Sequence, residues 1–133
     1  MHRALLALVL PLVLALAACG GRDEGQERVI EIRYSRFHPE EITVRAGEPV
    51  RIVLRNTDPI EHEWLVGDDA MHERNRSGTH AVHDEIPTEV TIPPLTEKVT
   101  TVTFSEPGEF AYICHLPGHE EYGMRGLVRV VAH

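Results

Sequence analysis

The stretch CHLPGHEEYGM, residues 114–124, gathers side chains that bind metals. Four residues separate Cys114 from His119, and four more separate His119 from Met124. A thiolate, an imidazole and a thioether together suit a soft or borderline metal, copper above all. The Pro-Gly pair before His119 favours a turn. One loop between two strands is therefore expected to wrap three ligands around a single ion.

A fourth ligand must come from elsewhere in the chain, and His62 is the candidate. It follows the turn-like stretch NTDPIE and opens the apolar run HEWLV. On its own, His62 would be read as an ordinary surface-loop histidine. Beside the C-terminal cluster, ligation is the favoured reading, because two histidines, one cysteine and a weak methionine form the ligand set of an electron-transfer copper centre.

Three residues beside these candidate ligands, His115, Glu120 and Glu121, each have more than one possible role. His115 is expected on the far face from Cys114, partly exposed, since adjacent residues of an extended strand point to opposite sides. The alternative, a relay to a second metal cluster, needs His-x-His pairs that this chain lacks. Glu120 and Glu121 directly follow His119, too close to reach the axial position easily, and are interpreted as solvated charges.

The polar segment 67–87 interrupts the apolar patterns and has no period of two. A connection of this length in a compact domain is often functional or mobile, and a short helix around residues 69–74 is compatible with it. The segment contains Met71, His72, His80 and His83. These residues raise the alternative of a second metal site for copper acquisition, although scattered histidines are more often part of a simple polar loop.

Short apolar runs must supply the elements that position the ligands. They are rich in Val, Ile, Thr and aromatic residues, are separated by Pro and Gly, and read VIEIRY, EITVRA, VRIVLRN, HEWLV, EVTIPP, KVTTVTF, FAYIC and LVRVVA. Such runs predict an all-β sandwich or barrel of seven to eight strands with a long inserted loop. FAYIC leads into the ligand loop and LVRVVA leads out of it, so sheet is expected at both ends of the loop.

The N-terminus has the features of a secretory signal. Residues 1–18 combine a basic start with an apolar run too short for a comfortable membrane span. The sequence LAAC, ending at Cys19, resembles a bacterial lipobox, which favours a lipidated cysteine over an ordinary signal peptide. We expect a signal peptide over 1–18, a lipidated flexible tether over 19–28 and one domain over 29–133. The protein would then be extracytoplasmic, held by lipid alone on the periplasmic side or at the cell surface.

The net charge of the chain limits the classes of macromolecule that it is expected to bind. The net charge of −8 makes nucleic acid an unfavourable partner and a basic protein surface a better one.

If Cys19 carries lipid, Cys114 is left without a disulfide partner in an oxidising compartment. Metal ligation is a good reason for such a thiol.

The chain resembles the cupredoxins of the plastocyanin/azurin family, in particular the auracyanin-like members. FHPEEITVRAGEPVRIVLRNTDPIEHEW matches the first half of the family pattern, and EPGEFAYICHLPGHEEYGMRGLVRV matches the second. The resemblance covers residues 29–131 apart from the inserted loop, and implies a Greek-key β-sandwich holding one copper ion. It also implies that His62, Cys114 and His119 are the strong equatorial ligands and Met124 the weak axial one.

One position departs from the family pattern. Many members have an asparagine directly after the first histidine, which helps to tie the ligand loops together, whereas this chain has Glu63. Asn56, in the preceding turn, is the candidate to replace it. Hydrogen bonds around the ligands tune copper sites, so the departure bears on the redox potential.

The resemblance implies a one-electron carrier and not an enzyme. Leu116 and Pro117 would form an apolar docking patch at the edge of the site, with Glu120 and Glu121 as an acidic margin. A basic redox partner, such as a cytochrome or a terminal oxidase domain, is expected there. The alternative is a copper-handling or resistance protein, which predicts more than one copper per chain or readily released copper. Enzymatic copper chemistry is disfavoured, because no ligands for a second catalytic copper are evident.

Overall fold

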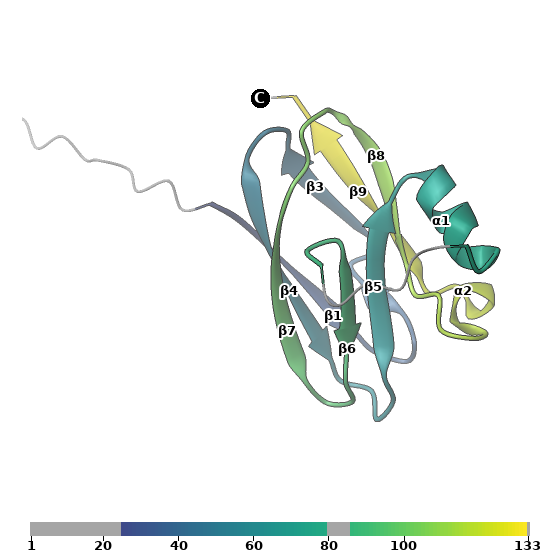
Figure 1. Ribbon diagram of the computed structural model, residues 1–133. Helices are drawn as coiled ribbons and strands as arrows, with labels where there is room; N and C mark the ends of the chain where they lie inside the picture. The colour runs from purple at the N-terminus through teal and green to yellow at the C-terminus, as the bar shows by residue number, and fades with distance from the viewer. Residues whose placement is uncertain (1–24, 80–85, 133) are drawn as a thin grey trace, which may run out of the picture.

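Alternating apolar and polar residues build two packed β-sheets in the computed structural model, which describes residues 25–79 and 86–132 (Figure 1). One sheet has the strand order β2-β1-β4-β7, with β1 (Gln26–Ile32), β2 (Phe37–His38), β4 (Pro49–Asn56) and β7 (Glu97–Thr103). The other has the order β3-β9-β8-β5-β6, with β3 (Glu41–Arg45), β5 (His62–Gly67), β6 (Glu89–Ile92), β8 (Gly108–Ile113) and β9 (Arg125–Val131). The expected β-sandwich is confirmed.

The described residues contain nine strands and not the seven or eight expected. The additional strand is β2, which pairs antiparallel with β1 through only two residue pairs and is too short to leave a periodic pattern. Strand β1 also begins earlier than the expected domain, so Gln26 to Arg28 belong to the sheet and not to the tether. The expected signal peptide and Cys19 lie outside the described residues, as do His80 and His83.

An aromatic cluster fills the core between the sheets. Tyr112 is fully buried, lies edge-on to Phe37 with ring centroids 5.1 Å apart, and has Trp64 on another side at 6.2 Å. Its hydroxyl donates a hydrogen bond to the Pro39 carbonyl at 2.8 Å. Gly126 is the registry partner of Tyr112 on β9, and a methyl group there would lie 2.2 Å from the tyrosine ring. The ring therefore occupies space that only a glycine leaves open.

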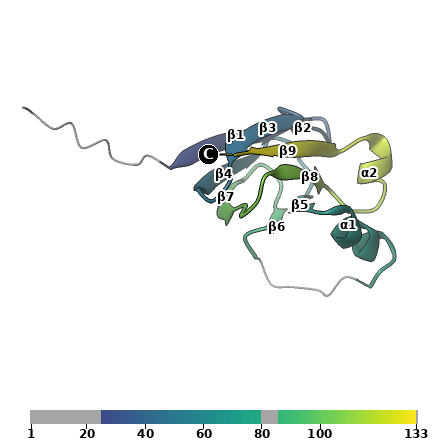
Figure 2. The same cartoon turned by 90° about the horizontal axis from the view of Figure 1, so that it is seen from above.

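Two short helices lie on the same side of the sandwich, as Figures 1 and 2 show. Helix α1 (Asp69–Arg76) follows β5 and is capped at its N-terminus by Asp68, whose carboxylate accepts a hydrogen bond from the Met71 amide at 2.7 Å. Helix α2 (His119–Tyr122) lies in the connection between β8 and β9. In residues 25–79 and 86–132, neither helix has the length and apolar character needed to cross a membrane.

Strand pairing brings the chain's ligand candidates to one end of a sheet. Strands β5 and β8 are antiparallel neighbours, with Leu65 opposite Ile113. The first residue of β5 and the residue that follows β8 therefore meet at the same end. These residues are His62 and Cys114, and β9 starts directly after Met124.

Candidate metal centre

Three potential ligand atoms converge between β5 and the β8–β9 loop. The Nδ1 atom of His119 lies 3.2 Å from the Cys114 sulfur and 3.3 Å from Nδ1 of His62. All three ligand atoms lie within 4.8 Å of one another. His62 and Cys114 are fully buried, and His119 is half-buried. The structure thus brings His62 together with the C-terminal loop, as the sequence predicts.

The loop that carries Cys114, His119 and Met124 is closed by its own backbone. The Cys114 amide donates to the Met124 carbonyl at 3.2 Å, and the Met124 amide donates to the His119 carbonyl at 3.0 Å. Gly118 and Gly123 flank α2 with φ of 83° and 100°, left-handed values that glycine adopts without strain. Met124 is fully buried. Three of the four expected ligands are therefore held in one hydrogen-bonded turn.

The carboxylate of Asp58, which the sequence pattern did not indicate, contacts His62 at the ring nitrogen that faces away from the ligand cluster. Oδ2 of Asp58 lies 2.9 Å from Nε2 of His62, on the opposite side of the ring from Nδ1. Burial alone would raise the pKa of Asp58, but hydrogen bonds from the Ser35 and Tyr34 amides and from His62 outweigh it and lower that pKa. Burial lowers the pKa of His62 despite the carboxylate. The pair is therefore an ionised Asp58 beside a neutral imidazole.

The thiol of Cys114 is fully buried and inaccessible to solvent. Burial raises the pKa of this thiol to about 11, although the Glu63 amide donates a hydrogen bond to the sulfur at 3.3 Å. The metal-free protein therefore keeps the thiol protonated at neutral pH. A metal that binds here must displace that proton.

Glu63 connects the two segments that carry the ligands. Besides its amide contact to Cys114, its Oε2 atom accepts a hydrogen bond from the His115 amide at 3.1 Å. Asn56, the candidate for this role, instead donates from its side chain to the carbonyls of Ile60, Ile92 and Pro93. Asn56 therefore secures the turn before His62, and the glutamate makes the tie to the ligand loop.

The side chain of His115 is more enclosed than the partly exposed histidine that was expected, although the residue as a whole is half-buried. Only 5% of its side chain is exposed, because α1 covers it. Its Nε2 atom lies 3.0 Å from Nδ1 of His72, and Nε2 of His72 donates to the Ala111 carbonyl at 3.1 Å. Burial lowers the pKa of His72, against the effect of the Ala111 bond. The two imidazoles join α1 to the ligand loop.

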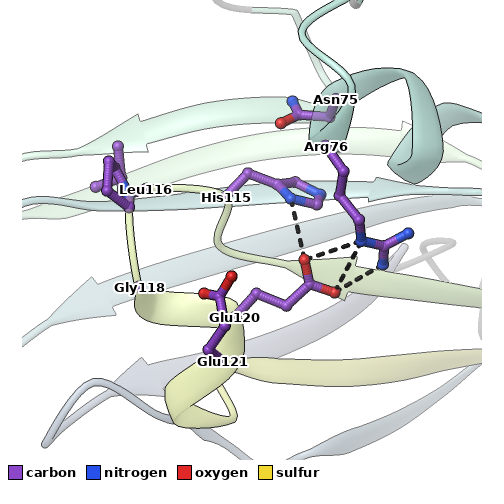
Figure 3. Close-up of a pocket in the computed structure, with 8 residues that line it drawn as sticks. Asn75, Arg76, His115, Leu116, Gly118, Glu120 and Glu121 are labelled. Atoms are coloured by element: carbon purple, nitrogen blue, oxygen red, sulfur yellow. Dashed lines mark hydrogen bonds and ion pairs between the residues drawn. The ribbon is translucent and has the colours of Figure 1, made fainter.

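Glu120 is not the solvated charge that the sequence suggested. Its side chain is 14% exposed and receives a hydrogen bond from Arg76 at 2.7 Å, with the His115 ring 3.5 Å away (Figure 3). Arg125 donates a further hydrogen bond to it at 3.2 Å. The Arg76 contacts lower the pKa of Glu120. The folded chain thus neutralises this carboxylate internally, whereas Glu121 is exposed.

The residues expected to dock a partner line a shallow pocket of about 280 Å³ beside the site (Figure 3). Pro117 is exposed and Leu116 is half-buried. The pocket is lined by Asn75, Arg76, His115, Leu116, Pro117, Gly118, Glu120 and Glu121. Helix α1 therefore contributes a cationic side chain to a surface that the sequence predicted to be apolar and acidic.

The residues proposed for a second metal site do not converge where they are described. His72 faces inward to His115, whereas the Met71 thioether packs against Gly67, where an added methyl group would lie 2.3 Å from the sulfur. Among residues 25–79 and 86–132, the one group of three or more Cys, His or acidic side chains with metal-ligand spacing is His62, Cys114 and His119.

Comparisons with known proteins agree with this geometry. Residues 5–128 match the family model for the cupredoxin-like domain. The copper-resistant cuproprotein CopI of Rubrivivax gelatinosus is 36% identical over 106 residues, covering 77% of this chain and 64% of the relative. The protein of the same name in Pseudomonas aeruginosa is 31% identical over 127 residues, covering 71% and 70%. The chain thus spans about two thirds of the length of these relatives.

Solved structures support the fold. Reduced auracyanin from Roseiflexus castenholzii superimposes with a TM-score of 0.68 at 20% identity, covering 80% of this chain and 98% of that one. Auracyanin A from Chloroflexus aurantiacus gives 0.61 at 23% identity, with 79% and 98% covered. With its matched domain, its sandwich and a His-Cys-His-Met set that resembles a type 1 copper site, this chain belongs to the cupredoxin-like domain family.

Proposed function

We propose that this protein binds one copper ion through His62, Cys114, His119 and Met124 and serves copper handling and tolerance outside the cytoplasm. The observation that carries the proposal is the convergence of the Cys114 sulfur with Nδ1 of His62 and of His119. The names of the relatives, copper-resistant cuproproteins, favour this role. Because this chain spans only part of those relatives, the extension of their copper-resistance role to this protein is itself part of the proposal.

The donor set fits copper better than other common metals. A thiolate and a thioether are soft ligands, and two imidazoles complete a set that Cu(I) and Cu(II) both accept. Methionine is a poor ligand for zinc, and calcium or magnesium would require oxygen ligands. When bound, copper supplies a one-electron couple between its two oxidation states.

The chain's own residues prepare the site for that ion. Neutral His62 presents the lone pair of Nδ1 because its other nitrogen is occupied by Asp58. Cys114 loses its proton on binding, and the Glu63 amide then donates to a thiolate. The apolar surroundings of the buried sulfur exclude water, which protects the thiol from oxidation in an oxidising compartment.

Copper stoichiometry and the visible spectrum test the proposal. The protein loaded with Cu(II) should hold one ion per chain and show an intense thiolate-to-copper band. Cys114→Ser should lose that band while keeping the far-ultraviolet circular dichroism of the β-sandwich. In a copper-sensitive bacterial host, wild-type protein should raise the tolerated copper concentration and Cys114→Ser should not. A folded wild-type protein that takes up no copper would overturn the proposal.

Electron transfer is the second candidate function. It is favoured by a ligand loop that is already closed by its own hydrogen bonds, so that little has to rearrange when one electron moves. In this proposal a basic partner, such as a cytochrome or terminal oxidase domain, docks at Leu116, Pro117 and exposed Glu121. Reversible cycling on an electrode and fast exchange with a partner would favour this function. Ready transfer of copper to a second protein, with slow electron exchange, would favour copper handling.

Lipid anchoring is also part of the proposal. The lipobox-like LAAC supports a signal peptide over 1–18 and lipidation of Cys19. Expression with labelled palmitate should label the wild-type protein and leave Cys19→Ala unlabelled. Equal labelling of the two proteins would exclude Cys19 as the anchor.

A further inference from the structure

We infer that Asp58 is a positioning residue of the metal centre: it fixes the His62 ring with Nδ1 toward the metal, and its charge shifts the site toward Cu(II). The inference rests on the proposed copper function and deepens it. Neither the family resemblance nor the relatives assign a role to this carboxylate.

The contact between the two residues sets the proton position on His62. Oδ2 of Asp58 lies 2.9 Å from Nε2 of His62, and both residues are buried. Both oxygens of Asp58 accept hydrogen bonds from backbone amides, so the carboxylate is the acceptor toward His62 as well and Nε2 carries the proton. Nδ1 then holds a lone pair, 3.3 Å from Nδ1 of His119. The tautomer that Asp58 selects is the one that ligates through Nδ1.

Asp58 is itself held from several sides, so it cannot swing away from the ring. The Tyr34 amide donates to Oδ1 at 2.7 Å and the Ser35 amide donates to Oδ2 at 2.8 Å. Tyr34 and Ser35 both have left-handed backbones, with φ of 56° and 51°, which is uncommon for residues other than glycine. The Asp58 amide also donates to Asn56 Oδ1 at 2.9 Å. The β1–β2 turn is thus built around this carboxylate.

A fixed carboxylate behind a ligand histidine has a predictable effect on copper. It makes the imidazole a stronger donor, as in the carboxylate–histidine–metal arrangements of other metalloproteins. It also adds a negative charge inside a medium of low dielectric. Both effects stabilise the ion of higher charge, so Asp58 lowers the reduction potential of the site.

Asp58→Asn is the direct test, and Glu61→Gln is its matched control. The asparagine keeps the shape of Asp58 but removes its charge and one acceptor oxygen. Glu61 is exposed and one residue from His62, so its substitution removes an equal charge from the same turn. We expect Asp58→Asn to weaken Cu(II) binding about 10- to 100-fold with a smaller loss for Cu(I). The reduction potential should rise by about 59 mV for each tenfold difference, while Glu61→Gln stays near wild type. A folded Asp58→Asn protein with the potential of Glu61→Gln would overturn the inference.

A second measurement covers the case in which Asp58→Asn does not fold. Long-range ¹H–¹⁵N spectra of the metal-free wild-type protein should show a slowly exchanging proton on Nε2 of His62. A bare Nε2, or one whose proton exchanges freely with solvent, would overturn the inference without any variant. If the wild-type protein bound no copper, the proposed function would fall. The Nε2 proton would then still report on the contact between Asp58 and His62.

Discussion

Oε2 of Glu63 accepts a hydrogen bond from the His115 amide across 3.1 Å, which joins the first ligand strand to the ligand loop. The amide of Glu63 also donates to the Cys114 sulfur at 3.3 Å. One residue thus contacts the ligand loop through both its backbone and its side chain. It does so where the family pattern has an asparagine.

Removing the Glu63 side chain should make the site release copper faster. Glu63→Ala removes the side-chain acceptor of the half-buried His115 amide, and we expect copper transfer to a strong chelator to become about tenfold faster. Glu63→Gln keeps an acceptor oxygen and should stay near the wild-type rate. Stopped-flow chelator competition measures both rates. Equal rates for the alanine and glutamine variants would show that the hydrogen bond does not restrain the loop.

Copper uptake should release a proton from Cys114. The thiol has a pKa raised to about 11 by burial, so at pH 7 to 9 the metal-free protein is protonated there and the copper-bound protein is not. The apparent Cu(II) affinity should rise about tenfold per pH unit in this range. Calorimetry in buffers of different ionisation enthalpy counts the released protons, and Cys114→Ser is the control. Binding heats independent of the buffer would contradict this prediction.

Burial of His72 should make the metal-free protein sensitive to acid. Its folded-state pKa lies below the ordinary value of 6.5, so below pH 6.5 the unfolded chain binds more protons. The free energy of unfolding should therefore fall as pH drops from about 6.5 through the folded-state pKa. His72→Ala should cost about 2 kcal/mol at pH 8, since it removes a buried side chain and its hydrogen bond to the Ala111 carbonyl. It should also flatten, but not abolish, the pH dependence, because His62 shifts in the same direction. Urea titrations at several pH values measure both effects, with exposed Arg74→Ala as the control for changes in the helix. An unchanged pH profile in His72→Ala would exclude this source of acid sensitivity.

The packing of Tyr112 against Gly126 should tolerate no added methyl group. A Cβ there would lie 2.2 Å from the tyrosine ring, and the ring is enclosed by Phe37 and Trp64. We expect Gly126→Ala to lower the free energy of unfolding by about 3 kcal/mol. In a double-mutant cycle with Tyr112→Leu, the cost of the alanine should shrink. Additive costs would place the strain elsewhere.

Charge changes at the two neighbouring glutamates should have different effects. Glu121 is exposed, so Glu121→Lys should slow electron exchange with a basic redox partner and weaken its salt dependence. Glu120 is paired with Arg76 and Arg125, so Glu120→Gln should act mainly by lowering stability. Exchange rates over a range of ionic strength and urea titrations separate the two. A salt dependence unchanged by Glu121→Lys would remove this residue from the docking surface.

The fold and the ligands could be predicted because both leave a local pattern. Period-two runs separated by Pro and Gly gave eight of the strands, and the spacing of Cys114, His119 and Met124 gave the loop. Burial of His115 and Glu120 could not be predicted, since it depends on α1 packing against the loop over 43 and 44 residues of chain. Asp58 left one weak signal, an acidic residue four positions before the first histidine. Without the fold, nothing distinguished it from Glu61, the other acidic residue of that turn.

The backbone closure of the 114–124 loop makes a compact unit of three of the four expected ligands. Two backbone hydrogen bonds close it from within, from Cys114 to Met124 and from Met124 to His119, and strands enter and leave it as adjacent partners. Outside the loop, Glu63 adds two further hydrogen bonds to it. Such a segment could be transplanted as one cassette onto another antiparallel hairpin of equal width. The recipient would then have to supply a histidine from a neighbouring strand, together with the contacts that Asp58 and Glu63 make here.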